Sequence, residues 1–164
     1  MALSGAIGWE VRTGGVDTNG GGFKVGASGT DWSQQNAAQY AVTDAVTDGT
    51  TTITSATANF GADVVGNVLY IQGGTGSIAA DWYEITVRNS ATSITVDRST
   101  GLTTGTGATL NIGGGFLTIQ TALSRMTVDT MITHLKLGTY NLAAALTTPS
   151  ATNTTYWRRL LGYQ

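Results

Sequence analysis

The stretch 116–140 places an amphipathic helix directly before a β-strand, and this order constrains the fold more than any other feature. Ile119, Leu123 and Met126 recur at i, i+4 and i+7, the spacing of one helix face, which predicts a helix near 116–126. Residues 131–137 are mostly apolar and are followed by a glycine, which predicts an extended strand and a tight turn. We therefore expect one short helix just before a C-terminal strand.

The amino-acid composition favours β-structure in the rest of the chain. The 164 residues include 30 threonines and 23 glycines, and only 11% of them are charged. Threonine favours strands and glycine favours turns, whereas the small supply of Glu, Lys and Arg disfavours long helices. A surface of hydroxyl and amide groups also suits assembly, because ordering a long side chain at an interface costs about 0.5–1.5 kcal/mol.

The middle of the chain, residues 50–112, shows the clearest alternation of apolar and polar residues. Short strands at this spacing with glycine-rich turns between them are typical of a small antiparallel barrel or sandwich. The predicted strands are 50–54, 68–72, 82–87, 93–97 and 108–112.

Two other regions flank this predicted barrel. Residues 1–49 have little periodicity, and we interpret them as an irregular attachment arm with one short strand at 9–12 and a turn-rich bridge at 44–49. Because glycine-rich backbone is costly to order, about 1–2 kcal/mol per residue, we expect residues 1–35 to be ordered chiefly by other protein chains. Residues 113–164 hold the helix and the C-terminal strands.

The charge and the residue types argue against several classes of partner. A net charge of −2 disfavours nucleic-acid binding, which depends on basic residues that displace counterions. No apolar run reaches the roughly 18 residues of a membrane span. The chain has no cysteine, so disulfides and thiolate chemistry are excluded.

The loops and the single histidine give poor ligand sites. Asp17 and Asn19 partly imitate a calcium loop, but Ser28 occupies the twelfth position, where a bidentate Glu is needed. We therefore expect these side chains to bind loop amides. The glycines at 113–115 lack the Gly-Lys-Ser/Thr of a phosphate loop, and His134 has no cysteine or carboxylate cluster with which to hold a metal. No cofactor is predicted.

Asp81, Glu84 and Asp97 lie on or beside neighbouring predicted strands and could form the carboxylate pair of a glycosidase. Cross-strand ion pairs, Glu84 with Arg98 or Arg88 with Asp97, are the simpler interpretation. We therefore expect no enzymatic activity.

The helix-to-strand segment resembles the first coil of a right-handed parallel β-helix of the pectate-lyase type, where a short helix covers the open end. The matching pattern reads "F-x-T-I-Q-x-A-L … D-T-I-x-L-x-x-G-x-Y". It is carried by Phe116, Thr118, Ile119, Gln120, Ala122, Leu123, Asp129, Thr130, Ile132, Leu135, Gly138 and Tyr140. The resemblance implies a rudimentary β-helix rung at the C-terminal end of the chain.

The N-terminal two thirds resembles virion proteins of tailed bacteriophages. The opening matches "W-x-V-R … G-x-D-x-N-G-G-G-F", and the later part matches "T-x-T-S … F … V-G-N-x-x-x-I … W-Y-E-I … V-D-R-S". The resemblance is carried by the residues 9–12, 17–23, 52–55, 60, 65–67, 71, 82–85 and 96–99.

This resemblance implies a non-enzymatic structural protein at the virion surface. Two placements stay open: a capsid decoration or cement protein bound to the major capsid protein or other virion proteins, and the base of a tail or head fibre or spike that binds host-surface glycan. A glycan-binding or depolymerising spike fragment and a bacterial surface module are further alternatives.

The family also implies a homotrimer, because one coil with an uncovered apolar end is a poor monomer. We expect its threefold contacts in residues 116–164 and place the strongest at Trp157 and Leu160. The four tryptophans could instead form a carbohydrate-stacking platform, although pinning loops or filling a subunit interface is the simpler role. The predicted interface residues are Trp9, Phe23, Trp32, Tyr156, Trp157, Leu160 and Leu161.

Overall fold

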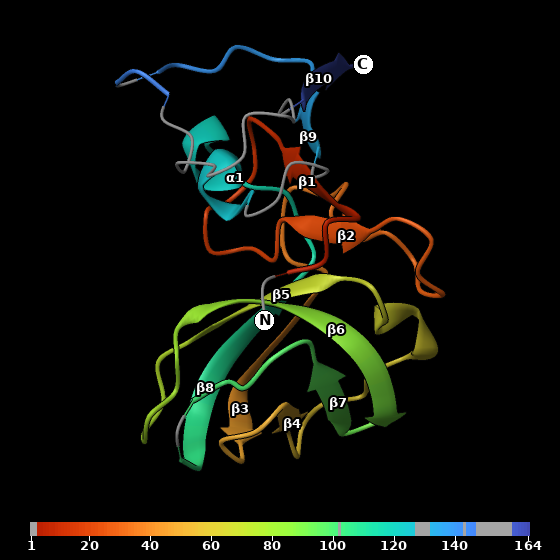
Figure 1. The fold of residues 1–164 in the computed structure, drawn as a ribbon, viewed down its shortest axis with the longest axis vertical. Coiled ribbons are helices and arrows are strands. Elements are labelled where there is room, and N and C mark those ends of the chain that lie inside the picture. Colours follow the sequence, from red (N-terminus) through yellow and green to blue (C-terminus); the bar gives the residue numbers. More distant parts are fainter. Residues whose placement is uncertain (1–2, 102, 127–131, 143, 147–158) are drawn as a thin grey trace.

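The computed structural model describes residues 3–101, 103–126, 132–142, 144–146 and 159–164. The chain folds into a closed barrel with a four-stranded sheet and one helix stacked on one end of it (Figure 1). The predicted fold class, mainly β with a small antiparallel barrel and one short helix, is confirmed.

The barrel has six antiparallel strands in the order β3-β4-β7-β6-β5-β8. Their bounds are β3 Tyr40–Thr47, β4 Thr52–Thr54, β5 Val68–Gln72, β6 Asp81–Ser90, β7 Ser93–Val96 and β8 Gly105–Ile112. A short 3₁₀ turn, η1 Ala62–Val64, lies before β5. Alternate residues point inward and fill the barrel, among them Ile53, Leu69, Ile71, Tyr83, Ile85, Ile94, Leu110 and Ile112. All five strands predicted within 50–112 are present.

The barrel also contains β3, although the sequence predicts these residues to lie in the irregular arm and in the bridge at 44–49. β3 pairs with β8, with Tyr40 opposite Ile112, and with β4, with Val46 opposite Thr54. The register of β3 against β8 shifts between Val42 and Ala45 and again after Ala45. Such bulges break the period-two pattern, so alternation in the sequence does not reveal this strand.

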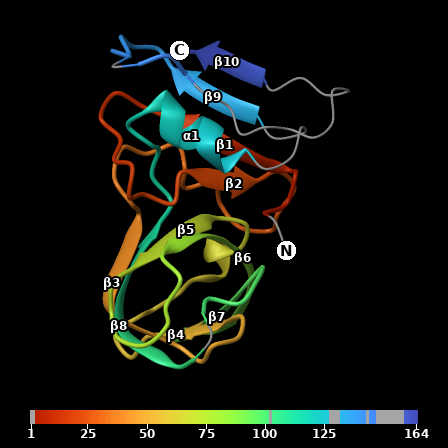
Figure 2. The same cartoon turned by 60° about the vertical axis from the view of Figure 1, so that its left-hand side comes forward.

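The second sheet has the order β10-β9-β1-β2. β1 Ile7–Val11 pairs with β2 Gly22–Lys24 in antiparallel fashion, whereas β9 Ile132–Lys136 and β10 Arg159–Tyr163 run parallel to β1. Figure 2 shows β9 and β10 side by side above β1. Trp9, Thr133 and Leu160 are aligned across the three parallel strands.

The helix α1, Ile119–Arg125, covers one face of this sheet. It is shorter than the predicted 116–126 because Thr118 caps it, accepting a hydrogen bond from the Thr121 N–H at 3.2 Å. Phe116 remains extended and bridges in parallel to Val11. The core between helix and sheet contains Leu3, Ile7, Trp9, Val11, Phe116, Ile119, Ala122, Leu123 and Met126.

This core corrects the interpretation of residues 1–35 as a segment ordered by other chains. Ile7, Trp9 and Val11 are buried within the chain itself, in the strand that pairs with both β2 and β9. The apolar residues of this glycine-rich segment therefore pack against α1 of the same chain, which lies more than a hundred residues later in the sequence.

The barrel and the sheet pack directly against each other. Val68 of β5 belongs to the core under α1, and Trp82 of β6 packs beside it. The Trp82 ring meets Phe116 edge to face at 5.9 Å, and its Nε1–H donates to the Asn19 carbonyl at 2.8 Å. The contact fixes the sheet on one end of the barrel.

Candidate functional site

A buried polar cluster joins the first and last strands on the sheet face opposite α1. Because side chains alternate along β1, Glu10 and Arg12 point away from the face that carries Trp9. Arg12 Nη1 donates to Glu10 Oε1 at 3.0 Å and to the Tyr163 hydroxyl at 3.0 Å. The Tyr163 hydroxyl in turn donates to Glu10 Oε1. Glu10 is 2% exposed and Arg12 8% exposed.

The environment of this cluster changes the acidity of two of its members. Burial raises the pKa of Glu10, although hydrogen bonds from Tyr163 and Arg12 and the Arg12 charge oppose that rise. Burial, together with the hydrogen bond donated to Glu10, raises the pKa of Tyr163 to about 12. The cluster therefore keeps the Tyr163 hydroxyl protonated and available as a donor.

Sequence reasoning missed this cluster, although a signal for it existed. The predicted strand at 9–12 alternates Trp9 and Val11 with Glu10 and Arg12, which indicates a strand with one apolar and one ionic face. Nothing in the sequence indicates that Tyr163 lies opposite that ionic face.

The predicted interface residues fall into three different environments. Trp9 is fully buried and stacks on Phe116 with ring centroids 5.6 Å apart, so its assignment to an intermolecular contact is wrong. Tyr156 and Trp157 lie outside the described residues. Trp9 is buried because it lies at the centre of a sheet whose apolar face is covered by α1.

Phe23 and Trp32 are half-buried and pin loops to the barrel. Phe23 of β2 bridges to Asn67, and Trp32 packs against the barrel core. The Trp32 N–H donates to Asn67 Oδ1 at 2.9 Å, and its carbonyl accepts from the Gly114 N–H at 2.8 Å. Asn67 is itself fully buried. These two aromatic residues hold the loop between β2 and β3 in place.

Leu160 and Leu161 are the described interface candidates that present apolar surface to solvent. Leu160 is 43% exposed and Leu161 is 37% exposed, although both belong to a paired strand, β10. Leu137 and Leu142 add exposed apolar surface between β9 and residue 146. Leu160 and Leu161 therefore remain candidates for an intermolecular contact.

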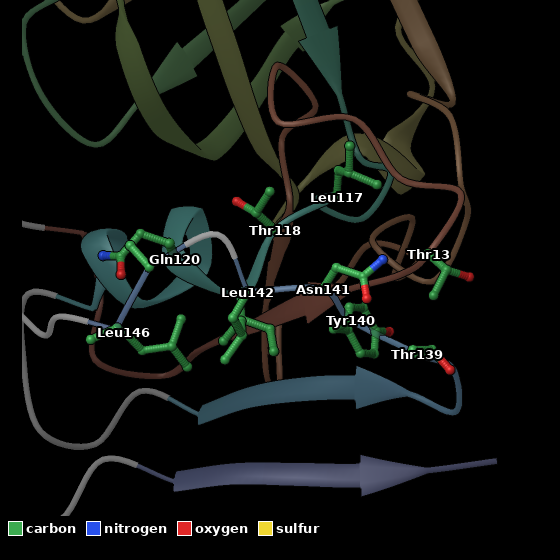
Figure 3. A pocket seen from close by; sticks show the side chains of 12 residues that line it. Thr13, Leu117, Thr118, Gln120, Thr139, Tyr140, Asn141, Leu142 and Leu146 are labelled. Atoms are coloured by element: carbon green, nitrogen blue, oxygen red, sulfur yellow. The ribbon is translucent and has the colours of Figure 1, made fainter.

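A pocket of about 510 Å³ lies between the start of α1 and the segment 139–146 (Figure 3). Leu117, Leu142 and Leu146 give it apolar walls, and Thr118 and Asn141 give it polar groups. Its volume falls within the range of small-molecule sites, roughly 300–1,000 Å³. The remaining lining residues are Thr13, Ile119, Gln120, Thr139, Tyr140, Ala144 and Ala145.

The three carboxylates considered for catalysis are held in ion pairs, but not in the predicted pairs. Glu84 is 2% exposed and binds Lys24 at 2.9 Å. Arg98 binds Asp97 at 2.8 Å and Asp81 at 2.9 Å. The predicted pairs are wrong because Glu84 and Arg98 bind these other partners.

The fourth residue of the predicted pairs, Arg88, donates its Nε–H to the Phe60 carbonyl at 2.8 Å. Arg125 of α1 also binds Asp81, at 3.3 Å. Asp81 thus links β6 to Arg98, which follows β7, and to Arg125 of the helix.

Asp17 and His134 have structural partners. Asp17 Oδ1 accepts from the Leu117 and Thr118 N–H groups at 3.0 and 2.9 Å, which fixes the approach to α1. Asp17 therefore binds backbone amides as expected, but they belong to a distant segment and not to its own loop. The expectation is wrong for Asn19, whose side-chain amide donates to the Asn36 and Gly115 carbonyls. The His134 ring lies edge-on to Tyr163, with centroids 6.5 Å apart. In the part of the chain that the structure describes, no three His, Cys, Asp or Glu residues gather as a metal site.

Among the described residues, no helix has the length and apolar character needed to cross a membrane. Comparison with protein-family models, with curated proteins and with solved structures finds no match.

Proposed function

We propose that this chain is a non-enzymatic structural protein of a tailed-phage virion, and that it decorates the outer shell by binding the major capsid protein or other virion proteins. The proposal starts from the sequence resemblance to virion proteins. The observation that carries it is the exposed apolar surface on the sheet end of the molecule, at Leu137, Leu142, Leu160 and Leu161. Exposed apolar groups that gather at one end of a molecule are typical of protein–protein contacts.

The ionic groups support a structural role over catalysis. Glu10, Glu84, Asp81 and Asp97 are each paired with a cation. A catalytic acid or base must reach its substrate, whereas these four carboxylates cross-link strands. Val68 of the barrel is part of the core between the sheet and α1. This shared core holds barrel and sheet together as one rigid unit, as a structural role requires.

A second placement, the base of a fibre or spike, is favoured by the parallel arrangement of β1, β9 and β10. Strands stacked in parallel and in register are the way in which a β-helix adds its coils. In that placement the pocket beside α1 would be the first place to look for bound host-surface glycan, since it combines apolar walls with hydroxyl and amide groups.

Gold labelling of purified virions with an antibody against this chain tests both placements. Label distributed over the head is the expected result for a decoration protein. Label confined to the tail or to head fibres would support the second placement instead. Virions that carry no label, and whose protein digest contains no peptide of this chain, would contradict both.

A further inference from the structure

The sheet has one open edge among the described residues, and that edge is β10. The barrel is closed and therefore has no edge strands. The outer side of β2 is covered, because Phe23 bridges to Asn67 and the Lys24 N–H donates to the Gly66 carbonyl at 2.8 Å. β10 is the terminal strand on the other side and pairs only with β9 within the described sheet.

The direction of the β10 backbone groups follows from one hydrogen bond. The Leu137 N–H donates to the Tyr163 carbonyl at 2.7 Å, so the backbone of Tyr163 faces β9. Because successive residues of a strand face opposite sides, the N–H and C=O groups of Leu160 and Gly162 point away from β9. These groups form the open edge.

β10 has few of the features that keep an edge strand from pairing with another strand, since Arg159 is its one charged residue. Its sequence, RLLGY, contains no proline, no acidic residue and no lysine. Its two leucines are partly exposed, and a methyl group added at Gly162 would meet nothing within 4 Å. The Glu10–Arg12–Tyr163 cluster holds the strand firmly in this position.

We propose that β10 pairs in antiparallel fashion with β10 of a second copy of this chain, about a twofold axis that passes beside Leu161. This register is self-complementary, because Leu161 meets Leu161 of the second copy and Leu160 meets Gly162. In this register the position of Arg159 lies opposite Tyr163 of the second copy, so the two Arg159 positions are not paired with each other. The pairing extends the existing hydrogen-bonded sheet into the second copy.

The number of free edges decides the stoichiometry. A twofold contact uses the same surface of both chains and closes at two. A threefold ring built by strand pairing would need two free edges on each chain, whereas the described residues offer one. This arrangement therefore departs from the homotrimer expected from the sequence. The dimer uses Leu160 and Leu161, two of the four exposed leucines on which the proposed virion contact rests, and the gold labelling tests that virion role separately from the dimer.

The first experiment compares Gly162→Pro with Gly162→Ala by light scattering from about 1 to about 100 µM. Proline removes an N–H that points away from β9, so the internal pairing of β10 is retained, whereas alanine keeps that N–H. We expect the wild type and Gly162→Ala to be dimers, and Gly162→Pro to dissociate at least tenfold more readily. Far-UV circular dichroism and amide exchange of β1 and β9 would establish that the proline variant is folded.

The second experiment uses the absence of cysteine from the chain. Leu161→Cys places two thiols in a pair that is not hydrogen-bonded, with Cβ atoms about 4.5–5.5 Å apart, and mild oxidation should link the two chains. Val25→Cys, at a position 71% exposed on another part of the surface, is the control and should remain unlinked. A monomeric or trimeric wild type, equal dimerisation of Gly162→Pro, or a Leu161→Cys variant that links no faster than the control would each overturn the proposal.

Discussion

Tyr163 in the last strand donates its phenolic hydrogen to the carboxylate of Glu10 in the first strand, across the intervening strand β9. Arg12 donates to both groups, so three polar side chains form one closed cluster on the sheet face opposite α1, where Glu10 and Arg12 are themselves buried. A hydrogen bond to a charged group contributes more than a neutral one, about 1.5–3 kcal/mol. The position of β10 thus depends on polar contacts as well as on strand pairing.

Replacement of Tyr163 by Phe should free β10 from this cluster. We expect the free energy of unfolding to fall by about 1.5–3 kcal/mol, because a buried carboxylate and a guanidinium lose a shared partner. Amide exchange at β10 should accelerate more than exchange in the barrel. Tyr70→Phe is the matched control, since Tyr70 contributes a ring that packs tilted against Trp82 with centroids 4.3 Å apart. Unchanged exchange at β10 in Tyr163→Phe would contradict the assignment.

The pH dependence of stability should carry a contribution from Glu10. Its pKa is raised in the folded chain from an ordinary value of 4.5, so the folded state binds this proton more tightly than the unfolded state does. The contribution is therefore fully present below pH 4.5 and is lost as the pH rises through the raised pKa. Urea unfolding over this pH range should show a decline for the wild type that is weaker in Glu10→Gln. Parallel profiles for the two proteins would refute the prediction.

Tyr163 should produce a second decline at alkaline pH. Its pKa of about 12 lies above the ordinary value of 10.0, so its contribution to stability is complete below pH 10 and is lost between pH 10 and pH 12. Burial also raises the pKa of Tyr83 and of Tyr140, so absorbance titration of tyrosinate should show several groups that ionise late. One of these late groups should be missing from Tyr163→Phe. Loss of an early-titrating group instead would show that Tyr163 is not held by Glu10.

Gly21 and Gly26 offer a matched test of how closely β2 approaches the helix core. Both have positive φ, +77° and +83°, so alanine costs about 1–2 kcal/mol of backbone strain at either position. A methyl group at Gly21 would lie 2.1 Å from the Phe116 ring, whereas one at Gly26 meets nothing within 4 Å. We expect Gly21→Ala to lose about 1–3 kcal/mol more than Gly26→Ala in urea unfolding. Equal losses would mean that the Phe116 ring does not pack there.

Asp17 should stabilise the start of α1 from a loop a hundred residues earlier. Asp17→Ala removes the acceptor of the Leu117 and Thr118 N–H groups and of the Thr118 hydroxyl, and we expect it to lower stability by about 0.5–2 kcal/mol. Asp17→Asn keeps one side-chain oxygen and should retain part of that stability. The measurement is thermal unfolding of the three proteins, and an alanine variant as stable as the wild type would contradict the contact.

Elements whose periodicity is local could be predicted from the amino-acid sequence. Residues 50–112 alternate clearly, and Ile119, Leu123 and Met126 lie on one helix face, so the barrel strands and the helix could be predicted from neighbouring residues. The strand 40–47 could not, because its bulges at Val42 and Ala45 hide the alternation.

Which apolar residues are exposed to solvent could not be predicted in this way, because exposure depends on the tertiary fold. Trp9 and Leu160 are aligned across the same sheet through Thr133, yet Trp9 is buried under α1 and Leu160 is exposed on an edge strand. The burial of an apolar residue depends on strand order and on what covers the sheet, and both arise from pairings between distant segments. For the same reason the Glu10–Tyr163 contact, between residues more than 150 positions apart, leaves no trace in local sequence patterns.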